Sequence, residues 1–538
     1  MEKPFTNRPS LDLRQGFVIM KAYKSNGKIE EGAMRKGKRM RRIFAVILAL
    51  WLLSAPALGA ESQPSPLVIT IAGPYADSLS SAYEDPLREF LEEKFAISFV
   101  PLQIDDANAS YAYRLRAAAN EFPDIMLYDA QWDFLYFIQA NSLRALPDVM
   151  SDYPHLRQYI TYPYAKNLQY DGKIWGIPRS LYAEEQRLPG YCVLVYKEYL
   201  AQTGVEEPVT MEDWQAFFRA IREANPDVIP LAAQSPWAMF NFSYFYAPFA
   251  NTWIWDTQTN SYVPGFYTQE YSQRIAALRT LWDEGLLDPD FMNVNCGRPS
   301  GVDRFLLGQA ACIVYPTSVH VLQAELMHLW AQLYPDTPME EKVEAFFLPC
   351  DASGQYSEFH ELNMSAIYFS ANVSDEKLDR ILQLLDYLCS PEGLLLRRWG
   401  LPEVDYTLQE GQPVSLLAEG TTLYDKYPSY CLLRILPNLD EDYIRSDPAL
   451  PAFAAKVAEK CKEWEELCVS QQRHWTSMRA NTILTDSGTY FNPNLTEISF
   501  RMLTAPEGVE ACFEQIKEEF RAQGIEQLIL KVTVSLLR

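Results

Sequence analysis

The stretch DGKIWGIP (Asp171–Pro178) predicts a turn and a short strand, and the apolar run Tyr191–Tyr196 follows it closely. Asp-Gly favours a turn because glycine tolerates a positive φ and the aspartate side chain hydrogen-bonds nearby backbone. Pro178 ends the short strand, since proline has no N–H to donate to a sheet. Tyr191–Tyr196 is long enough for a buried strand. We therefore expect a first crossing between two lobes here, with a ligand cleft beside it.

Apolar segments and helical patterns alternate on both sides of this stretch. Strands are expected at 67–72, 97–104, 123–128, 230–232, 310–315, 344–348 and 366–369. Helices are expected at 80–94, 109–119, 134–140, 210–221, 269–284, 322–334, 375–389, 453–467 and 509–520. This alternation predicts an α/β protein with a parallel sheet covered by helices on both faces. A chain of 538 residues is also long enough for two or more lobes.

The first sixty residues have the pattern of an export signal. Basic residues between Arg35 and Arg42 precede the apolar run Ile43–Leu53, and small residues follow up to Ala60. Eleven apolar residues are short of the roughly 20 that span a bilayer, so we expect a signal peptide in 1–60. An uncleaved membrane anchor is the alternative. We also expect the reading frame to be over-extended at its start, with Met34 or Met40 as the more natural first residue.

The net charge argues against binding to nucleic acid or anionic membranes, and the cysteines argue against a disulfide-stabilised fold. Residues 1–60 hold 12 of the 47 Lys and Arg and 4 of the 70 Asp and Glu, so the remainder carries a formal net charge of −31. Such a surface repels nucleic acid and anionic membranes. The nine cysteines form no CxxC pair and predict no disulfide framework; Cys192, Cys312 and Cys389 lie in apolar runs, where buried thiols are expected.

Catalytic and metal-binding patterns are not found in the sequence. It contains no phosphate-binding glycine loop, no nucleophile elbow and no HExxH, and its five histidines are far apart. Asp256–Asn260 resembles a calcium loop, but Tyr267 stands where the bidentate glutamate belongs, so we predict no metal site there. A carboxylate pair of the glycosidase kind is left open, since Asp and Glu are abundant. We predict no catalytic residues, no cofactor and no metal.

Five segments, taken together and in order, resemble a known family. They are PDIMLYDAQWDFLYFIQANSLRALPD (123–148), YDGKIWGIPRS (170–180), VYKEYLAQTGVEEPVTMEDWQAFFRAI (195–221), YTQEYSQRIAALRTLWDEGLLDPDF (267–291) and LLDYLCSPEGLLLRRWG (384–400). They are similar to segments of bacterial extracellular solute-binding proteins of ABC transporters, in the maltose-binding-like class (family 1). The long lipoprotein-like branch associated with oligosaccharides is the most similar, although the lipid-modified cysteine of that branch is not found after the apolar run.

The resemblance implies a two-lobe, periplasmic-binding-protein-like fold of type II with interlobe hinge crossings. The crossings would lie near 190–196, near 362–368 and within 400–430. Lobe 1 would comprise 66–190 and 365–410, and lobe 2 would comprise 191–364 and 411–538.

The implied ligand is a carbohydrate, and the candidate site residues follow from sugar chemistry and strand ends. Aromatic rings stack on the C–H faces of sugars, and fixed polar groups bind the hydroxyls. Ligands of such sheets bind at the carboxyl ends of strands. The expected ligand-binding residues are Tyr128, Asp129, Gln131 and Trp132 in lobe 1, Trp175, Arg179 and Tyr182 at the hinge, Trp237, Phe240, Tyr315 and Thr317 in lobe 2, and Trp475 in the C-terminal part. For Trp175 and for the aromatic segment 237–255, packing in a core is the alternative.

The sequence thus predicts a monomeric, exported binding protein rather than an enzyme. The implied partners are an oligosaccharide and the membrane permease subunits of an ABC transporter, with no nucleic acid. The expected location is extracellular or at the cell surface, and periplasmic in a Gram-negative source. A secreted glycan-active enzyme, a glycosidase or lyase, stays as the alternative.

Overall fold

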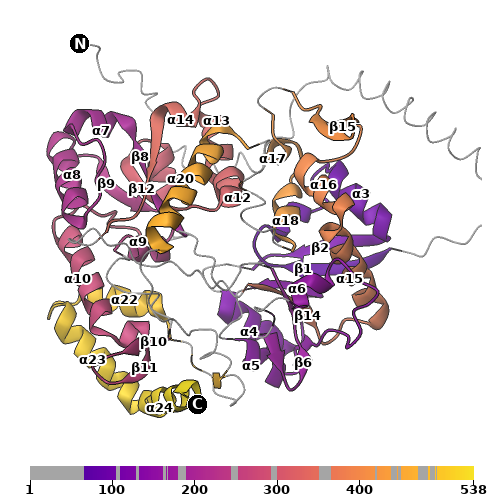
Figure 1. The fold of residues 1–538 in the computed structure, drawn as a ribbon, viewed down its shortest axis with the longest axis horizontal. Helices are drawn as coiled ribbons and strands as arrows, with labels where there is room; N and C mark the ends of the chain where they lie inside the picture. Colours follow the sequence, from indigo (N-terminus) through magenta and orange to yellow (C-terminus); the bar gives the residue numbers. More distant parts are fainter. Residues whose placement is uncertain are drawn as a thin grey trace, which may run out of the picture. The chain divides into compact units, whose positions relative to one another are not determined.

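The computed structural model describes residues 66–537 of the chain, with gaps. Not described within this range are 105–108, 129–132, 162–164, 166–167, 180–189, 244–252, 293–299, 351–364, 419–420, 438–444, 446–449, 470–482, 485–490 and 492. The expected signal segment 1–60 therefore lies outside the described residues. Figure 1 shows the described elements coloured along the sequence. In this part of the chain no helix is both long enough and apolar enough to cross a membrane.

The first lobe is built on a sheet with the strand order β2-β1-β3-β14-β4, and β7 pairs with β14. Its strands are β1 (Leu67–Ala72), β2 (Ile97–Leu102), β3 (Ile125–Tyr128), β4 (Leu143–Arg144), β7 (Ile177–Pro178) and β14 (Ala366–Ser370). Strand β1 runs parallel to β2 and β3, whereas β14 runs antiparallel to β3, β4 and β7. The expected parallel pairing is therefore found for β1, β2 and β3 but not for β14. A parallel neighbour is normally reached through a crossover helix that packs on the same sheet. Strand β14 instead follows β13 of the second lobe, so it can run antiparallel.

Both faces of this sheet are buried, as its unbroken apolar runs predict. Ile71 of β1 and Leu127 of β3 belong to the core on one face. Met126, the residue before Leu127, belongs to the core on the other face. The helices of this lobe are α3 (Pro86–Phe95), α4 (Ala109–Ala119), α5 (Phe134–Gln139), α6 (Arg157–Thr161), α15 (Asp375–Cys389), α16 (Pro391–Trp399), α17 (Leu423–Lys426) and α18 (Tyr430–Ile435). Helices α3 and α15 supply one core, and α4 and α5 supply the other.

The segment that contains α17 and α18 differs from its expected place. We expected residues 411–538 in lobe 2, but Leu423, Tyr427 and Leu433 are buried in the same core as β1 and α3. The backbone N–H of Ser429 also donates to Oδ2 of Asp85, at the start of α3, over 2.6 Å. Lobe 1 therefore extends to the end of α18. A hairpin of β15 (Tyr406–Gln409) and β16 (Gln412–Ser415) precedes this segment.

The stretch 171–178 forms the expected turn and strand. Asp171 and Gly172 both have a positive φ, 50° and 71°, and they connect β5 (Gln169–Tyr170) to β6 (Lys173–Ile174) in a hairpin. Two central residues with positive φ match the right-handed twist of the flanking strands. The chain then joins the first sheet through β7, which ends at Pro178 as predicted.

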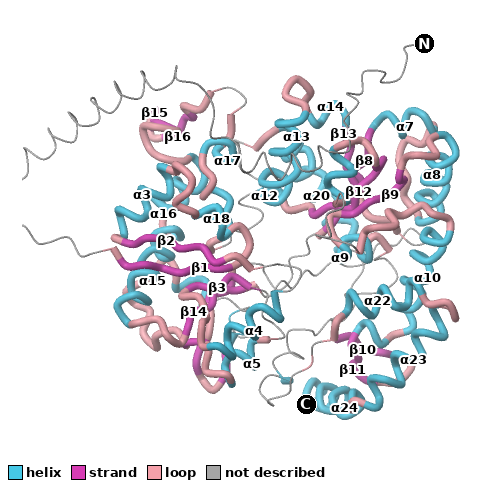
Figure 2. Tube along the Cα trace, turned by 180° about the vertical axis from the view of Figure 1, so that it is seen from behind, coloured by secondary structure: helices cyan, strands magenta, loops and turns pink. Residues whose placement is uncertain are grey.

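The second lobe is built on a sheet with the order β13-β8-β12-β9. Its strands are β8 (Tyr191–Tyr196), β9 (Ile229–Ala233), β12 (Ala310–Pro316) and β13 (Val343–Phe346), and a separate hairpin pairs β10 (Trp253–Asp256) with β11 (Ser261–Pro264). Strand β12 is parallel to β9 and antiparallel to β8, so this sheet is mixed too. Figures 1 and 2 show α7 and α8 beside this sheet. Cys192 and Cys312 lie on its strands and are fully buried, as expected, and burial raises the pKa of both thiols well above the usual range.

Helices surround this second sheet and complete its core. They are α7 (Lys197–Thr203), α8 (Met211–Ala224), α9 (Pro236–Asn241), α10 (Gln269–Asp283), α11 (Gly301–Leu306), α12 (Val319–Val321), the π-helix η6 (Leu322–Met327), α13 (His328–Leu333), α14 (Met339–Lys342), α20 (Ala452–Val469), α22 (Leu495–Thr504), α23 (Val509–Ala522) and α24 (Ile525–Leu537). The predicted capping box of Thr210 and Asp213 opens α8. Phe453 and Trp464 of α20 are buried in this core.

The chain therefore changes lobe three times along its described residues. Sheet membership changes between β7 and β8 and again between β13 and β14. Packing changes a third time between α18, in the core of the first lobe, and α20, in the core of the second. The first two changes of sheet fall between residues 178 and 191 and between residues 346 and 366. The third lies after residue 435 and not within 400–430, because α17 and α18 pack on the first sheet.

A carboxylate on the edge strand β13 attaches the returning helix α20 to the second sheet. Oε2 of Glu344 accepts from Nζ of Lys456 at 2.6 Å, and its Oε1 lies 3.1 Å from Nζ of Lys460. Burial raises the pKa of Glu344, but the bonds from the two lysines outweigh burial and leave the pKa below its ordinary 4.5. Its ionised form is therefore more stable in the folded than in the unfolded chain.

Replacing Glu344 by glutamine should lower the free energy of unfolding by about 1 kcal/mol at neutral pH. The pKa of Glu344 is lower in the folded chain than in the unfolded chain, so the ionised carboxylate stabilises the fold. This stabilisation is complete at a pH above the unfolded pKa and is lost as the pH falls through the folded pKa. The difference between the variant and the wild type should therefore shrink below about pH 4.5. Urea denaturation across this range measures it. Glu341→Gln, on the exposed side of α14, is the control, and a difference that stays constant with pH would contradict the assignment.

Candidate functional site

The carboxyl ends of the parallel strands lie where an open α/β sheet binds its ligands. In the first lobe these are the ends of β1 and β3, and in the second lobe they are the ends of β9 and β12. Gly73 directly follows β1 with φ 137°, and a Cβ there would lie 2.6 Å from the backbone oxygen of Leu127. Only glycine allows β1 to leave the sheet this close to β3. The chain then reaches Tyr75, whose φ of 61° is in the left-handed region.

Tyr75 makes a hydrogen bond to the second lobe. Its hydroxyl donates to Oε1 of Glu325 at 2.5 Å, and the hydroxyl of Tyr315 donates to Oε2 of the same carboxylate at 3.2 Å. Glu325 belongs to η6 and Tyr315 to β12, so one carboxylate joins the ends of β1 and β12. Burial, followed by the charge of Glu325, raises the pKa of both phenols well above the usual range. Both hydroxyls therefore stay protonated and donate.

His320 contacts the rings of two tyrosines, Tyr75 and Tyr424. Its Nδ1 is hydrogen-bonded to the hydroxyl of Tyr424 at 2.7 Å, and its ring meets that of Tyr75 edge-on at 5.7 Å. Within the described residues, its Nε2 is buried and has no hydrogen-bond partner. Burial and, after it, three nearby guanidinium groups lower the pKa of His320 to about 3, so the ring is neutral. The guanidinium groups belong to Arg434, Arg179 and Arg397.

A second histidine contacts the same short helix, α17. Nδ1 of His328 lies 3.3 Å from Oδ1 of Asp425, which also closes the capping box of α17 with Thr422. Burial raises the pKa of Asp425, but bonds from His328 and Thr422 outweigh burial, so the pKa lies below its usual value. The segment from Ser318 to His328 of the second lobe thus contacts the first lobe through Tyr75 and α17.

No family model matches the chain. Lipoprotein LipO of Bacillus subtilis is 23% identical over 374 residues, which are 65% of this chain and 69% of LipO. The polygalacturonan/rhamnogalacturonan-binding protein YtcQ of B. subtilis is 25% identical over 150 residues, 27% of this chain and 29% of YtcQ.

Solved structures match over most of the described chain. A structure of the alginate-binding protein AlgQ2 without calcium ion has a TM-score of 0.65 at 15% identity, covering 88% of this chain and 99% of AlgQ2. The ABC-transporter substrate-binding protein FusA of S. pneumoniae, in complex with kestose, has a TM-score of 0.61 at 14% identity, covering 88% and 98%. The chain has the two-lobe fold of ABC-transporter solute-binding proteins. The expected fold class is thereby confirmed.

Within this solute-binding fold, the predicted residues of the first lobe are partly described. The hydroxyl of Tyr128 donates to Oδ2 of Asp133 at 2.9 Å, and the same carboxylate accepts from Ser110 at 2.7 Å and from Nε of Arg114 at 2.8 Å. Tyr128 therefore bonds a partly buried ion pair of Arg114 and Asp133 at the end of β3. Its predicted neighbours Asp129, Gln131 and Trp132 lie outside the described residues.

The two described hinge candidates make local contacts. Nε1 of Trp175 donates to the carbonyl of Tyr170 at 2.9 Å, and the half-buried ring packs against the core that contains α4 and α5. The alternative of core packing is thus favoured for Trp175. The backbone N–H of Arg179 donates to the carbonyl of Ser365 at 3.0 Å, and its guanidinium donates to the hydroxyl of the same serine. Arg179 directly follows β7 and Ser365 directly precedes β14, so these bonds join the two crossings where they meet the first sheet. Tyr182 lies outside the described residues.

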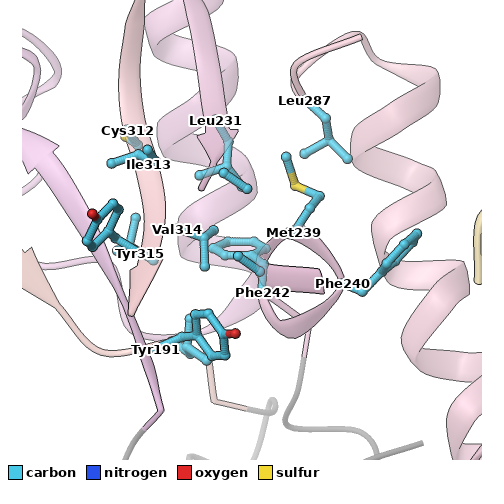
Figure 3. Close-up of a cluster of buried hydrophobic side chains, with 14 of the residues drawn as sticks. Tyr191, Leu231, Met239, Phe240, Phe242, Leu287, Cys312, Ile313, Val314 and Tyr315 are labelled. Carbon is cyan, nitrogen blue, oxygen red and sulfur yellow. The ribbon is translucent and has the colours of Figure 1, made fainter. Parts of the chain in front are cut away.

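In the second lobe, three predicted ligand contacts are buried. Phe240 is 1% exposed and meets the ring of Phe291 edge-on at 5.6 Å, and Figure 3 shows it on α9 beside the buried cluster. We expected it in the binding site, but it belongs to the core because α9 turns this face inward. Tyr315 and Thr317 are also buried, at 0% and 3% exposed, so neither is open to a ligand in this structure.

Of the remaining second-lobe candidates, Trp237 is the one that the structure leaves partly accessible. It is half-buried at the start of α9, directly beyond the carboxyl end of β9. Trp475 lies outside the described residues.

The turn that resembles a calcium loop uses its first carboxylate within the turn. Oδ1 of Asp256 accepts from the backbone N–H of Gln258 at 2.9 Å, and its Oδ2 accepts from the hydroxyl of Thr259 at 2.6 Å. Within the described residues no three His, Cys, Asp or Glu side chains are grouped to hold a metal ion.

Sequence reasoning missed Tyr75, His320, Glu325 and Tyr424. Tyr75 follows β1 just as Tyr128 ends β3, so the strand-end rule that selected Tyr128 could have selected it. No local pattern singles out Glu325, whose partner is 250 positions away.

Proposed function

We propose that this chain captures an oligosaccharide between its two lobes and delivers it to the permease of an ABC transporter. The observation that carries the proposal is the fold shared with AlgQ2 over 88% of this chain and 99% of that protein. Similar structures include the binding proteins for alginate and kestose, and YtcQ binds polygalacturonan and rhamnogalacturonan. The strand ends of this chain also carry the aromatic and polar side chains that bind sugars.

The proposed protein acts outside the cytoplasm and catalyses no reaction. The basic and apolar pattern in 35–60 and the lipoprotein relative LipO support export. Its contacts in the cleft would come from Trp237 and Tyr128, together with the candidates outside the described residues. Those are Asp129, Gln131, Trp132, Tyr182 and Trp475. We propose that it works as a monomer, with the permease as its only protein partner.

A panel of plant and host oligosaccharides tests binding and turnover together. It should include neutral and uronic sugars, because the guanidinium groups of Arg434, Arg179 and Arg397 act on His320 near the strand ends. One member should raise the unfolding temperature in a saturable way, corresponding to about 2.7 kcal/mol at a hundred times its Kd, with no product released. Product that disappears on replacing one carboxylate would establish the glycan-active enzyme instead.

A matched pair of tryptophans locates the binding. Trp237→Ala should weaken affinity by about tenfold through lost stacking. Trp255→Ala, on the β10–β11 hairpin away from the ends of β9 and β12, should leave affinity unchanged. Equal losses in both variants would count against a site at the end of β9.

A further inference from the structure

One side-chain contact between the lobes joins the two strand ends that face a ligand in this fold. The hydroxyl of Tyr75, beyond β1, donates to Glu325 of η6 at 2.5 Å. The side chains of Tyr75 and Glu325 are both half-buried. A hydrogen bond to an ionised acceptor is shorter and stronger than one between neutral groups. Separation of the lobes must break it.

Both partners lie in backbone that proteins reserve for special positions. Tyr75 adopts a φ of 61° and a ψ of 9°, a conformation that a bulky residue rarely takes. Such residues cluster at ligand clamps and switch regions, where the surrounding structure holds them. Glu325 lies in a π-helix, a geometry found mostly as single turns at functional sites. The two irregularities meet in one hydrogen bond.

We propose that Tyr75 and Glu325 form a latch, which stabilises the closed form of the protein. This inference rests on the proposed function, since it assigns regulation to the cleft of that binding protein. Closure brings the ends of β1 and β12 together and forms the bond, and opening breaks it. A ligand can shift the balance only by its differential affinity for the two forms, and the latch sets where the balance starts.

His320 opposes the latch and keeps the balance adjustable. Its neutral ring packs against Tyr75, with Nε2 buried and without a hydrogen-bond partner among the described residues. A buried polar atom of this kind destabilises the form in which it occurs. The latch and the buried nitrogen therefore act in opposite directions on the same closed form.

Solution scattering of the ligand-free chain tests the latch without any knowledge of the sugar. Tyr75→Phe removes the hydroxyl and keeps the ring, and we expect a larger radius of gyration than in the wild type. Tyr315→Phe removes the bond to the same carboxylate from within the second lobe, so it is the matched control and should leave the radius unchanged. Glu325→Gln should give an intermediate change, because its amide oxygen still accepts a weaker, neutral bond.

The expected size of the effect is about tenfold in the ratio of closed to open molecules, or about 1.4 kcal/mol. Hydrogen exchange of the Ser318–His328 peptide should rise by a similar factor in Tyr75→Phe. An unchanged radius in Tyr75→Phe, or an equal increase in Tyr315→Phe, overturns the latch. Neither readout uses a ligand, so this result is independent of whether any oligosaccharide binds.

Discussion

Asp85→Ala should lower the free energy of unfolding by about 3 kcal/mol. Asp85 is fully buried, and its Oδ1 caps α3 by accepting from the backbone of Leu87 at 3.1 Å and of Arg88 at 3.0 Å. Its Oδ2 accepts from the backbone of Ser429 at 2.6 Å. Alanine leaves three buried N–H groups without an acceptor, and each carries a desolvation cost.

Urea denaturation gives the loss of stability, and hydrogen exchange shows where it arises. Exchange should accelerate in α3 and, equally, in the peptide from Ser429 to Ile435, although they are far apart in sequence. Asp85→Asn is the control, because its amide oxygen can still cap α3, and we expect less than half the loss. Faster exchange in α3 alone would contradict the role of Asp85 as the link between these segments.

Asp85 also shows where the sequence misleads. We expected a helix from residue 80, but α3 begins at Pro86, since Asp85 is its N-cap and proline favours the first helical position. We placed 411–538 in lobe 2, yet α17 and α18 belong to lobe 1. A bond between positions 344 apart attaches them there, and no periodicity reports such a bond.

Elements with strong local signals were predicted well. Helix α15 matches the expected 375–389, and α10 differs from its expected range by one residue. The apolar runs of β8 and β12 are buried strands. Strand direction was not predictable, because β14 reaches its sheet from the other lobe. Residues 322–334 were expected as one α-helix, but the structure has the π-helix η6 followed by α13. The spacing of apolar residues does not distinguish an α-helix from a π-helix.

The candidate site was predictable in its principle more than in its residues. Tyr128 ends β3, and Trp237 and Thr317 follow β9 and β12, as the strand-end rule expects, while ligand binding at these residues stays a prediction. The rule cannot tell a side chain that faces the cleft from one buried in the core of its own lobe, as Tyr315 is. That distinction depends on how η6 packs beside β12, where Tyr315 donates to Glu325.

Gly301→Ala should lower the free energy of unfolding by about 3 kcal/mol. Gly301 is the first residue of α11, and a Cβ there would lie 1.9 Å from the carbonyl oxygen of Ala233, at the end of β9. That oxygen belongs to backbone, so the strand or the helix must move. Strand β9 is held by its ladder to β12, through Val314 opposite Ala233, and resists such a shift.

Gly308→Ala is the control for Gly301→Ala. It measures the cost of replacing a glycine where the added Cβ meets no other atom. Gly308 has φ 67°, and a Cβ there meets nothing within 4 Å, so we expect a loss of only about 1 kcal/mol. Gly301→Ala should also weaken the proposed oligosaccharide binding, because Trp237 follows β9 by four residues and moves with its end. Urea denaturation and titration of both variants measure these effects. Equal stability of the two variants would mean that α11 can shift freely against β9, and the close approach would then have no role in holding the site.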